Sequence, residues 1–173
     1  NSIANHMLKK KLKIGDIVLV AARKDILVFA TIFACLKIGC TYSLIDFDMP
    51  QERLKKILDK CRARLYVFSS NSDYKKIKSK EKIDLKKIKM KKNQFEKLRC
   101  KLNISDKVPA YIMFTSGATG LPKGALISRK SLLIIVKVSK MKLLINQRDI
   151  LTNVNHIYFD NSVFDIFASL LNS

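Results

Sequence analysis

The sequence predicts the α/β class, with a layered and mainly parallel sheet flanked by helices. Short apolar runs rich in β-branched residues alternate with longer segments whose apolar residues recur at helical spacing. The helical segments are too long to be hairpin loops, so the strands that they join are expected to lie parallel. The 173 residues, 48% of them apolar, can bury one core but are few for two domains.

The first elements follow from spacing and end residues. Apolar residues at helical spacing predict a helix within residues 3–12, and the run 16–22 (DIVLVAA) predicts a buried strand. A helix is expected over residues 26–36, because Asp25 can cap its start and Gly39 stands where a helix commonly ends. This helix is apolar on nearly every face, so it must be covered on more than one side.

Two more strands and a helix follow. Residues 41–45 and 65–68 are predicted to be short strands. Between them Pro50 opens a helix, since proline is favoured in a first helical turn. The apolar residues of this helix fall on one face: Leu54, Ile57, Leu58 and Cys61.

Residues 75–101 interrupt the alternation. They contain thirteen Lys or Arg against three acidic residues, which accounts for half of the net charge of +20. We interpret this run as a solvated, lysine-rich connector. A nucleic-acid patch is the less favoured alternative, because the run holds a single Arg and almost no aromatic residue that could stack on a base.

Regular structure resumes in the second half of the chain. Residues 110–115 and 125–127 are predicted to be strands on either side of a glycine-rich turn, and a helix is expected over residues 130–140. Residues 151–154 are predicted to form a further strand. The last helix is expected to start near Ser162, whose hydroxyl would serve as its N-cap.

Composition restricts the classes of partner and site. The net charge of +20 raises nucleic acid, anionic membranes and phosphate-bearing ligands as partners, without choosing among them. The longest apolar stretch is too short to span a bilayer and no secretion signal marks the start, so we expect a cytoplasmic protein with no membrane partner. Lys outnumbers Arg 27 to 7 across the whole chain, so the basic bias is global and no specific nucleic-acid partner is expected. The cysteines lack the spacing of a zinc site, so no metal site is predicted and reduced, buried thiols are expected: Cys35, Cys40, Cys61 and Cys100.

The most informative segment is 111–124 (YIMFTSGATGLPKG), in which a strand leads into a turn of small residues, hydroxyls and one cation. Glycines let backbone N–H groups approach phosphate oxygens, hydroxyls add donors, and the Lys123 ammonium offsets negative charge. The turn therefore suits a polyphosphate, although a glycine-rich β-turn with a solvent lysine has a similar composition. A Walker loop is excluded, because Gly124 rather than Ser or Thr follows Lys123.

This loop resembles the signature of the adenylate-forming enzymes, Y-x-x-[FY]-T-S-G-[ST]-T-G-x-P-K-G, at nearly every position. Two further segments resemble the branch that activates amino acids, the adenylation domains of non-ribosomal peptide synthetases. Residues 36–46 (LKIGCTYSLID), continued through residue 54, are similar to its LKAGxAYVPID…P…ERL motif, and residues 159–167 (FDNSVFDIF) to its FDxSVFDIF motif. The resemblance covers the whole chain except the lysine-rich run, in the order and at the spacing of the family.

The resemblance implies an ATP-dependent ligase. In this family ATP and a carboxylate form an acyl-adenylate and pyrophosphate, and the acyl group then passes to a phosphopantetheine thiol on a carrier-protein domain. ATP, Mg²⁺, an amino-acid substrate and such a carrier are therefore the implied ligands and partner. The motif positions that would hold the ATP phosphates are Thr115, Ser116, Gly117, Ala118, Thr119, Gly120, Lys123 and Gly124.

Individual motif positions carry further implied roles. Lys123 is the implied catalytic cation, and ordering of the loop is its alternative role. Ala118 replaces the Ser or Thr of the signature, which removes one phosphate donor at a cost of about 1 kcal/mol if that hydroxyl bonds the ligand. Asp160 matches the aspartate that binds the α-amino group of the substrate, or else it is an electrostatic partner of the last helix. Asn161 and Phe164 match the next two pocket positions.

Other readings stay open beside this one. We assign Asp46 and Arg53 to turn and helix structure, and His156 to a loop. An acyl- or aryl-CoA synthetase shares the phosphate loop but is not expected to show the motif at Asp160, whereas a degenerate, non-catalytic remnant or a basic binding protein is the alternative from another class. The ribose-binding aspartate, hinge and C-terminal lysine of the family have no counterpart in the 173 residues, so we expect the N-terminal part of an adenylation domain, inactive alone.

Overall fold

The computed structural model describes residues 1–70, 72–73, 77, 79, 81–88, 97–98, 102–115 and 122–171. Its strands are β1 Ile17–Ala21, β2 Thr41–Ile45, β3 Leu65–Phe68, β4 Lys82–Asp84, β5 Pro109–Thr115 and β6 Lys123–Ser128. Its helices are α1 Ser2–Lys9, α2 Ile26–Ile38, α3 Gln51–Cys61, the 3₁₀ helix η1 Leu85–Lys87, α5 Arg129–Met141 and α6 Asp160–Leu171. Across these described ranges, no helix has both the length and the apolar character needed to cross a membrane.

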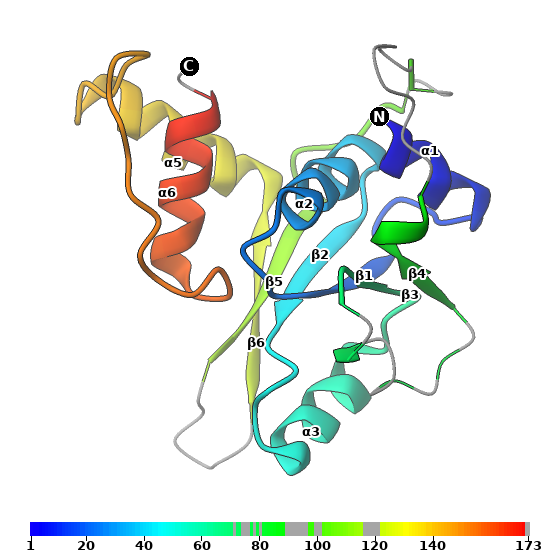
Figure 1. The fold of residues 1–173 in the computed structure, drawn as a ribbon. Helices are drawn as coiled ribbons and strands as arrows, with labels where there is room; N and C mark the ends of the chain where they lie inside the picture. Colours follow the sequence, from blue (N-terminus) through cyan, green and yellow to red (C-terminus); the bar gives the residue numbers. More distant parts are fainter. Residues whose placement is uncertain are drawn as a thin grey trace.

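The strands form one six-stranded sheet in the order β4-β3-β1-β2-β5-β6 (Figure 1). Every pair of neighbouring strands is parallel except the β5–β6 hairpin, which is antiparallel. The connection through α2 moves one way along the sheet and the connection through α3 moves back past β1, so right-handed crossovers place these helices on opposite faces. The predicted α/β fold with a mainly parallel sheet is confirmed.

Strand β1 is buried on both faces of the sheet. Val18 and Val20 join the core beneath α1 and α2, whereas Leu19 and Ala21 join the core against α3. All four side chains are at most 1% exposed. Full burial of an aliphatic side chain contributes about 1.5–3 kcal/mol, and a strand covered on both faces needs the continuous apolar run that the sequence shows.

The ends of α2 are fixed by the residues expected to cap it. Asp25 accepts a hydrogen bond from the backbone N–H of Leu27 at 2.8 Å. Gly39 ends the helix with a φ of +76°, where any side chain would be strained. A Cβ at Gly39 would also stand 3.0 Å from a side-chain carbon of Ile14 and 3.2 Å from one of Ile104. Both predicted caps are confirmed.

The C-terminal half adds two helices to the face that carries α2. Ser128 caps α5 by accepting from the backbone N–H of Ser131 at 3.0 Å. Helix α6 packs against α5 and against α2, where the rings of Phe33 and Phe167 lie 5.5 Å apart (Figure 1). This packing fixes the axis of α6 and brings its first residues to the carboxyl end of the sheet.

Two predictions for the last segment are wrong. Residues 151–154 form no strand, and Ser162 is not the N-cap of α6, which begins two residues earlier at Asp160. Ser162 is buried inside the helix, and its hydroxyl donates to the carbonyl oxygens of Asn155 and His156, 3.2 and 3.0 Å away. The hydroxyl therefore ties the preceding loop to the helix instead of capping a helix start.

The lysine-rich run contains a strand that its pattern does not predict. Strand β4 pairs with β3 at the edge of the sheet, and Ile83 and Leu85 are 3% and 1% exposed. At these positions the run contributes to the sheet and the core. A solvated connector stays our prediction for the rest of residues 75–101, many of which lie outside the described residues.

Three cysteine thiols are free and buried: Cys35, Cys40 and Cys61. Burial raises the pKa of Cys40 to about 12 and that of Cys61 to about 11, and it places the pKa of Cys35 well above its usual value. These thiols behave as small core side chains rather than as nucleophiles. Cys100 lies outside the described residues.

Candidate functional site

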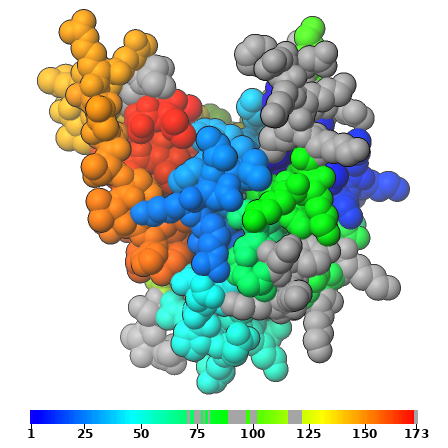
Figure 2. All heavy atoms as spheres, viewed as in Figure 1, coloured from blue at the N-terminus to red at the C-terminus, as the bar shows by residue number. Residues whose placement is uncertain are grey.

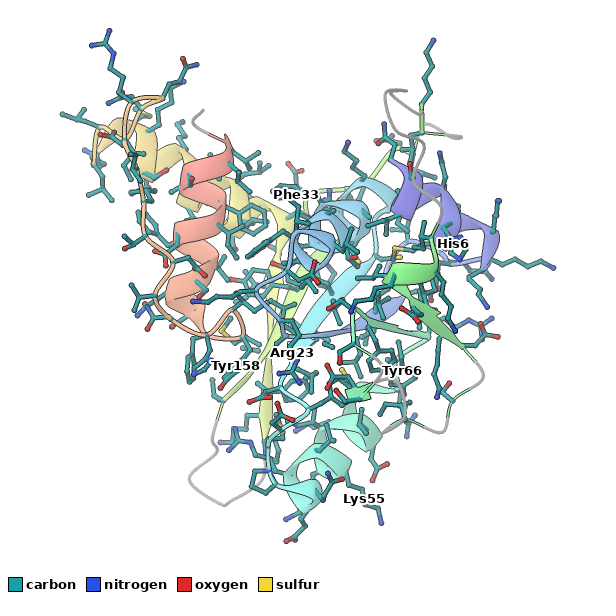
Figure 3. All side chains as sticks on the ribbon, in the orientation of Figure 1. His6, Arg23, Phe33, Lys55, Tyr66 and Tyr158 are labelled. Atoms are coloured by element: carbon teal, nitrogen blue, oxygen red, sulfur yellow. The ribbon has the colours of Figure 1, made fainter. Side chains whose placement is uncertain are left out.

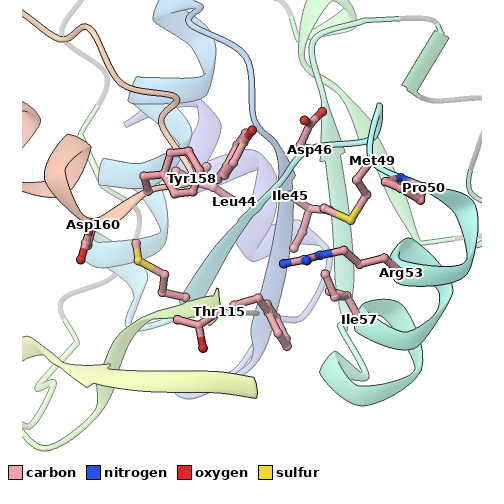
Figure 4. Close-up of a pocket in the computed structure, with 13 residues that line it drawn as sticks. Leu44, Ile45, Asp46, Met49, Pro50, Arg53, Ile57, Thr115, Tyr158 and Asp160 are labelled. Atoms are coloured by element: carbon pink, nitrogen blue, oxygen red, sulfur yellow. The ribbon is translucent and has the colours of Figure 1, made fainter. Parts of the chain in front are cut away.

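A cavity of about 550 Å³ opens at the carboxyl ends of β2 and β5 (Figure 4). Ligands of parallel α/β sheets commonly bind at this edge, where loops rather than strands present the side chains. The lining residues come from three separate stretches of sequence: Leu44, Ile45, Asp46, Met49, Pro50, Arg53 and Ile57; Met113, Phe114 and Thr115; and Tyr158, Phe159 and Asp160. We call the first stretch the α3 wall and the third the α6 wall.

The α3 wall carries one carboxylate and one guanidinium. Asp46 follows β2 directly, and its Oδ1 accepts a hydrogen bond from the backbone N–H of Asp48 at 2.9 Å. Arg53 extends from α3 toward the centre of the cavity (Figure 4). Within the described part of the chain, Arg53 forms no ion pair, so this wall offers a cation to a bound anion.

The α6 wall reaches across the cavity through Tyr158. Partial burial and, second, the negative charge of Asp46 raise the pKa of Tyr158, against the opposing positive charge of Arg53. The ring of Tyr158 also lies 4.8 Å from that of Phe159 and stacks on the ring of His156 at 5.2 Å. The Tyr158 side chain and the Asp46 carboxylate therefore bring the two walls close to each other, and an aromatic cluster supports the tyrosine ring.

Asp160 is the first residue of α6, and its exposed carboxylate lines the cavity. Its Oδ1 accepts from the backbone N–H of Asn161 at 2.8 Å. Burial and, second, the negative charge of Asp160 raise the pKa of Tyr111. Asn161 is exposed and Phe164 is half-buried, and neither is among the residues that line the cavity.

Paired strand ends flank the segment that is predicted to bind phosphate. Thr115, the last residue of β5, lines the cavity and pairs with Lys123, the first residue of β6. The Thr115 hydroxyl lies 3.5 Å from the Lys123 carbonyl oxygen. Gly124 permits a close approach, since a Cβ there would stand 3.1 Å from side-chain carbons of Ile112 and Phe114. Lys123 and Gly124 are exposed and do not line the cavity.

Most of the predicted phosphate-binding positions fall outside the described residues: Ser116, Gly117, Ala118, Thr119 and Gly120. Their roles stay predictions. The structure shows the two strand ends that flank this segment, Thr115 and Lys123, and they lie at the same edge of the sheet as Asp160.

The sequence patterns do not single out three polar residues of the cavity. Asp46 and Arg53 were assigned to local structure, although both lie in a recognised motif and follow a strand that ends at the site. No sequence pattern points to Tyr158, although it directly precedes the motif that begins at Phe159. In a parallel sheet, polar residues just after a strand are the ones to examine.

Comparison with known proteins places these features in a family. The family model described as AMP-binding enzyme matches residues 1–173. Over 172 residues the chain is 32% identical to tyrocidine synthase 2 of Brevibacillus parabrevis and 33% identical to bacitracin synthase 1 of Bacillus licheniformis. These matches cover 99% and 98% of this chain but 5% and 3% of the relatives. The chain thus spans a small part of the length of the curated relatives it matches.

Solved structures agree with the fold. The N-terminal subdomain of Klebsiella oxytoca NpsA in complex with 3-hydroxybenzoyl-AMSN matches with a TM-score of 0.79 at 21% identity, over 99% of this chain and 42% of that one. A four-domain nonribosomal peptide synthetase, AB3403, bound to AMP and glycine, matches with a TM-score of 0.84 at 22% identity, over 98% of this chain and 12% of that one. Since the family model spans all 173 residues and the fold agrees, the chain belongs to the AMP-binding enzyme family.

Proposed function

We propose that the protein containing this chain activates an amino acid with ATP as the aminoacyl-adenylate and transfers the acyl group to a carrier-protein thiol. The observation that carries the proposal is the convergence of three motifs on one cavity. Residues 44–54, 111–115 and 159–160 belong to different motifs, and each contributes side chains to the lining. Such a gathering is expected where one site must hold a nucleotide and an acid together.

The first step joins the substrate to the nucleotide. A carboxylate oxygen of the amino acid attacks the α-phosphorus of ATP, and the bond from that phosphorus to the bridging oxygen breaks to release pyrophosphate. Charge on the phosphate oxygens grows and moves during this step, so donors and cations held at fixed positions stabilise the transition state. In the second step the carrier thiol attacks the acyl carbon and AMP leaves.

The described donors fit a polyphosphate. The Thr115 hydroxyl and the Lys123 ammonium stand on paired strand ends, and in the described residues no carboxylate pairs with Lys123. Enzymes of this family use ATP, typically with Mg²⁺, which neutralises phosphate charge when bound. The described residues contain no cluster of three or more His, Cys, Asp or Glu that could enclose a metal ion. This is compatible with Mg²⁺, which proteins commonly bind through phosphates, water and one or two carboxylates.

Asp160 is the proposed partner of the substrate ammonium. An amino acid brings a cation next to the apolar lining of Phe159 and Met113, where an unpaired charge would be costly to desolvate. A carboxylate at the cavity wall offsets this cost. Asn161 and Phe164 are proposed to contact the side chain of the substrate where it extends beyond the cavity described above.

The test is amino-acid-dependent exchange of labelled pyrophosphate into ATP by the full-length protein that contains this chain. A panel of amino acids, matched with aryl and fatty acids, is supplied one at a time. Exchange that depends on one or a few amino acids supports the proposal. Exchange with acids that lack an amino group would instead support a CoA ligase, and no exchange with any acid would support a non-catalytic protein.

A further inference from the structure

We propose that Arg23 and Lys24 are positioning residues that hold the two walls of the cavity, Arg23 the α3 wall and Lys24 the α6 wall. This inference rests on the proposed function of that cavity. The two residues are neighbours in the turn between β1 and α2, and neither lines the cavity. In the space-filling view, the blue segment around the start of α2 lies between the cyan segment of α3 and the orange C-terminal segment (Figure 2).

We call the contacts from Arg23 to the α3 wall the Arg23 arm, and the first of them is to a buried carboxylate. The Nε and Nη2 of Arg23 donate to Oδ2 and Oδ1 of Asp73 at 3.1 and 2.9 Å, and the side chain of Asp73 is fully buried. Nη2 also lies 3.0 Å from Oδ2 of Asp48. Among the contacts of Arg23, the hydrogen bond to Asp73 contributes most to raising its pKa. Asp73 thus fixes the guanidinium, which is then available to hold Asp48.

Asp48 carries this arm into the cavity. Its backbone N–H donates to Asp46, which lines the cavity together with Tyr158. The loop between β2 and α3 is therefore tied at one end to the guanidinium of Arg23 and at the other to the cavity lining. Figure 3 shows Arg23 at the end of the sheet that faces α3.

The contacts from Lys24 to the α6 wall, the Lys24 arm, are made to backbone carbonyls rather than to a side chain. Its ammonium donates to the carbonyl oxygens of Asn153 and Val154 at 2.5 and 3.0 Å. Asn153 in turn donates from Nδ2 to Ser162 at 3.2 Å and to Asp165 at 3.1 Å. Lys24 thereby fixes the end of the irregular loop that precedes Tyr158, and the same contacts reach the first turns of α6.

The arrangement explains why two adjacent cations are tolerated. Each of the two faces its own acceptors, the carboxylates for Arg23 and the carbonyls for Lys24, so their mutual repulsion is offset locally. Because both branch from one turn at the end of the central strand, the separation of the walls is set by a rigid element. Displacing groups that hold a substrate weakens its placement in the site, so such a brace would matter for the affinity of the cavity for its ligand.

The test separates the two arms with variants outside the cavity lining. Lys24→Gln removes the ammonium, and Asp48→Asn weakens the contact to Arg23 while the pair with the buried Asp73 stays intact. Asp48 is 58% exposed at its side chain and Lys24 is exposed, so both variants are expected to fold. Lys55→Gln, a change at an exposed lysine of α3, is the matched control (Figure 3).

Hydrogen–deuterium exchange of the full-length protein measures how firmly the backbone of each wall is held. Lys24→Gln should speed exchange of peptides covering residues 151–162 and leave residues 44–54 as in the wild type. Asp48→Asn should do the reverse, and Lys55→Gln should change neither. Unchanged exchange in both variants, or faster exchange spread over β1 and β3 as well, would overturn the proposal.

Kinetics then test positioning. In pyrophosphate exchange, Lys24→Gln should raise the KM for the amino acid by about three- to tenfold, because the α6 wall that carries Asp160 is held less firmly, with kcat changed by less than about twofold. Lys24→Arg keeps a cation that can reach two carbonyls and should restore most of the affinity. If the wild type shows no exchange, the proposed function fails, whereas the deuterium pattern still decides the roles of Arg23 and Lys24.

Discussion

The side chains around Asp160 show how single residues set the chemistry of the cavity. Its carboxylate has one backbone donor, the N–H of Asn161, and stands at a helix start, where the helix dipole favours a negative charge. Across the cavity, Arg53 supplies the opposite charge from α3. Opposite charges on two walls suit a ligand that carries both an ammonium and an anionic group.

The first prediction tests Asp160 as the ammonium partner. Asp160→Asn keeps the shape of the side chain and removes its charge, so kcat/KM for the amino acid should fall by a factor that corresponds to about 2–5 kcal/mol, the range for breaking a charge pair that the bound substrate desolvates. The Kd of ATP should change little, because the loop after Thr115 is untouched. The measurement is pyrophosphate exchange with the amino acid and with its des-amino analogue.

The two substrates provide the internal control for this prediction. The des-amino acid lacks the cation, so it should be a poor substrate of the wild type and lose less on substitution. Asp106→Asn, a change at an exposed acid that does not line the cavity, should leave both substrates unaffected. An equal fractional loss for the two substrates in Asp160→Asn would show that Asp160 only stabilises the start of α6.

At the scale of elements, the parts whose signal is local could be predicted. Strand β1 shows a continuous apolar run, and α2 carries Asp25 and Gly39 at its ends, so both were placed to within two residues. The role of Ser162 in α6 could not be predicted, because its hydroxyl bonds to a loop whose path depends on tertiary packing. Strand β4 was missed because only Ile83 is apolar among its three residues, which is too short for a period to show.

The second prediction tests whether β4 is part of the folded core. Ile83 is 3% exposed and packs in the core that contains Leu65 and Val67. Ile83→Ala should therefore lower the free energy of unfolding by about 2–4 kcal/mol, as for other buried isoleucines. Lys86→Gln, at an exposed residue three positions on, should change it by less than about 0.5 kcal/mol. Urea denaturation measures both, and equal small effects would place Ile83 in a solvated connector.

At the scale of the whole molecule, the site depends on where the sheet brings its motifs. Parallel strands end at one edge, so the stretches after β2 and β5 could be expected to meet, and the cavity confirms that they do. Which side chains would face the cavity was not predictable, because Tyr158 sits in an irregular loop whose direction is set by Lys24 and Ser162. Local patterns carry no information on such long-range contacts.

The net charge of +20 gives the last prediction. Lys and Arg number 34 against 14 Asp and Glu, so the folded chain repels itself, and pairs such as Lys10–Glu81 and Lys56–Glu52 are exposed and contribute little. Raising NaCl from about 0.01 to 0.15 M shortens the screening length from about 30 to 8 Å, which weakens the repulsion more than the few attractive contacts. If screening adds about 1 kcal/mol of stability, the Tm of the 173-residue chain should rise by about 2–4 °C. The matched control replaces four exposed lysines by Glu: Lys55, Lys107, Lys130 and Lys137. The lower net charge of this variant should reduce the rise in Tm with salt. A Tm that falls with salt in the unaltered chain would mean that attractive ion pairs dominate its surface.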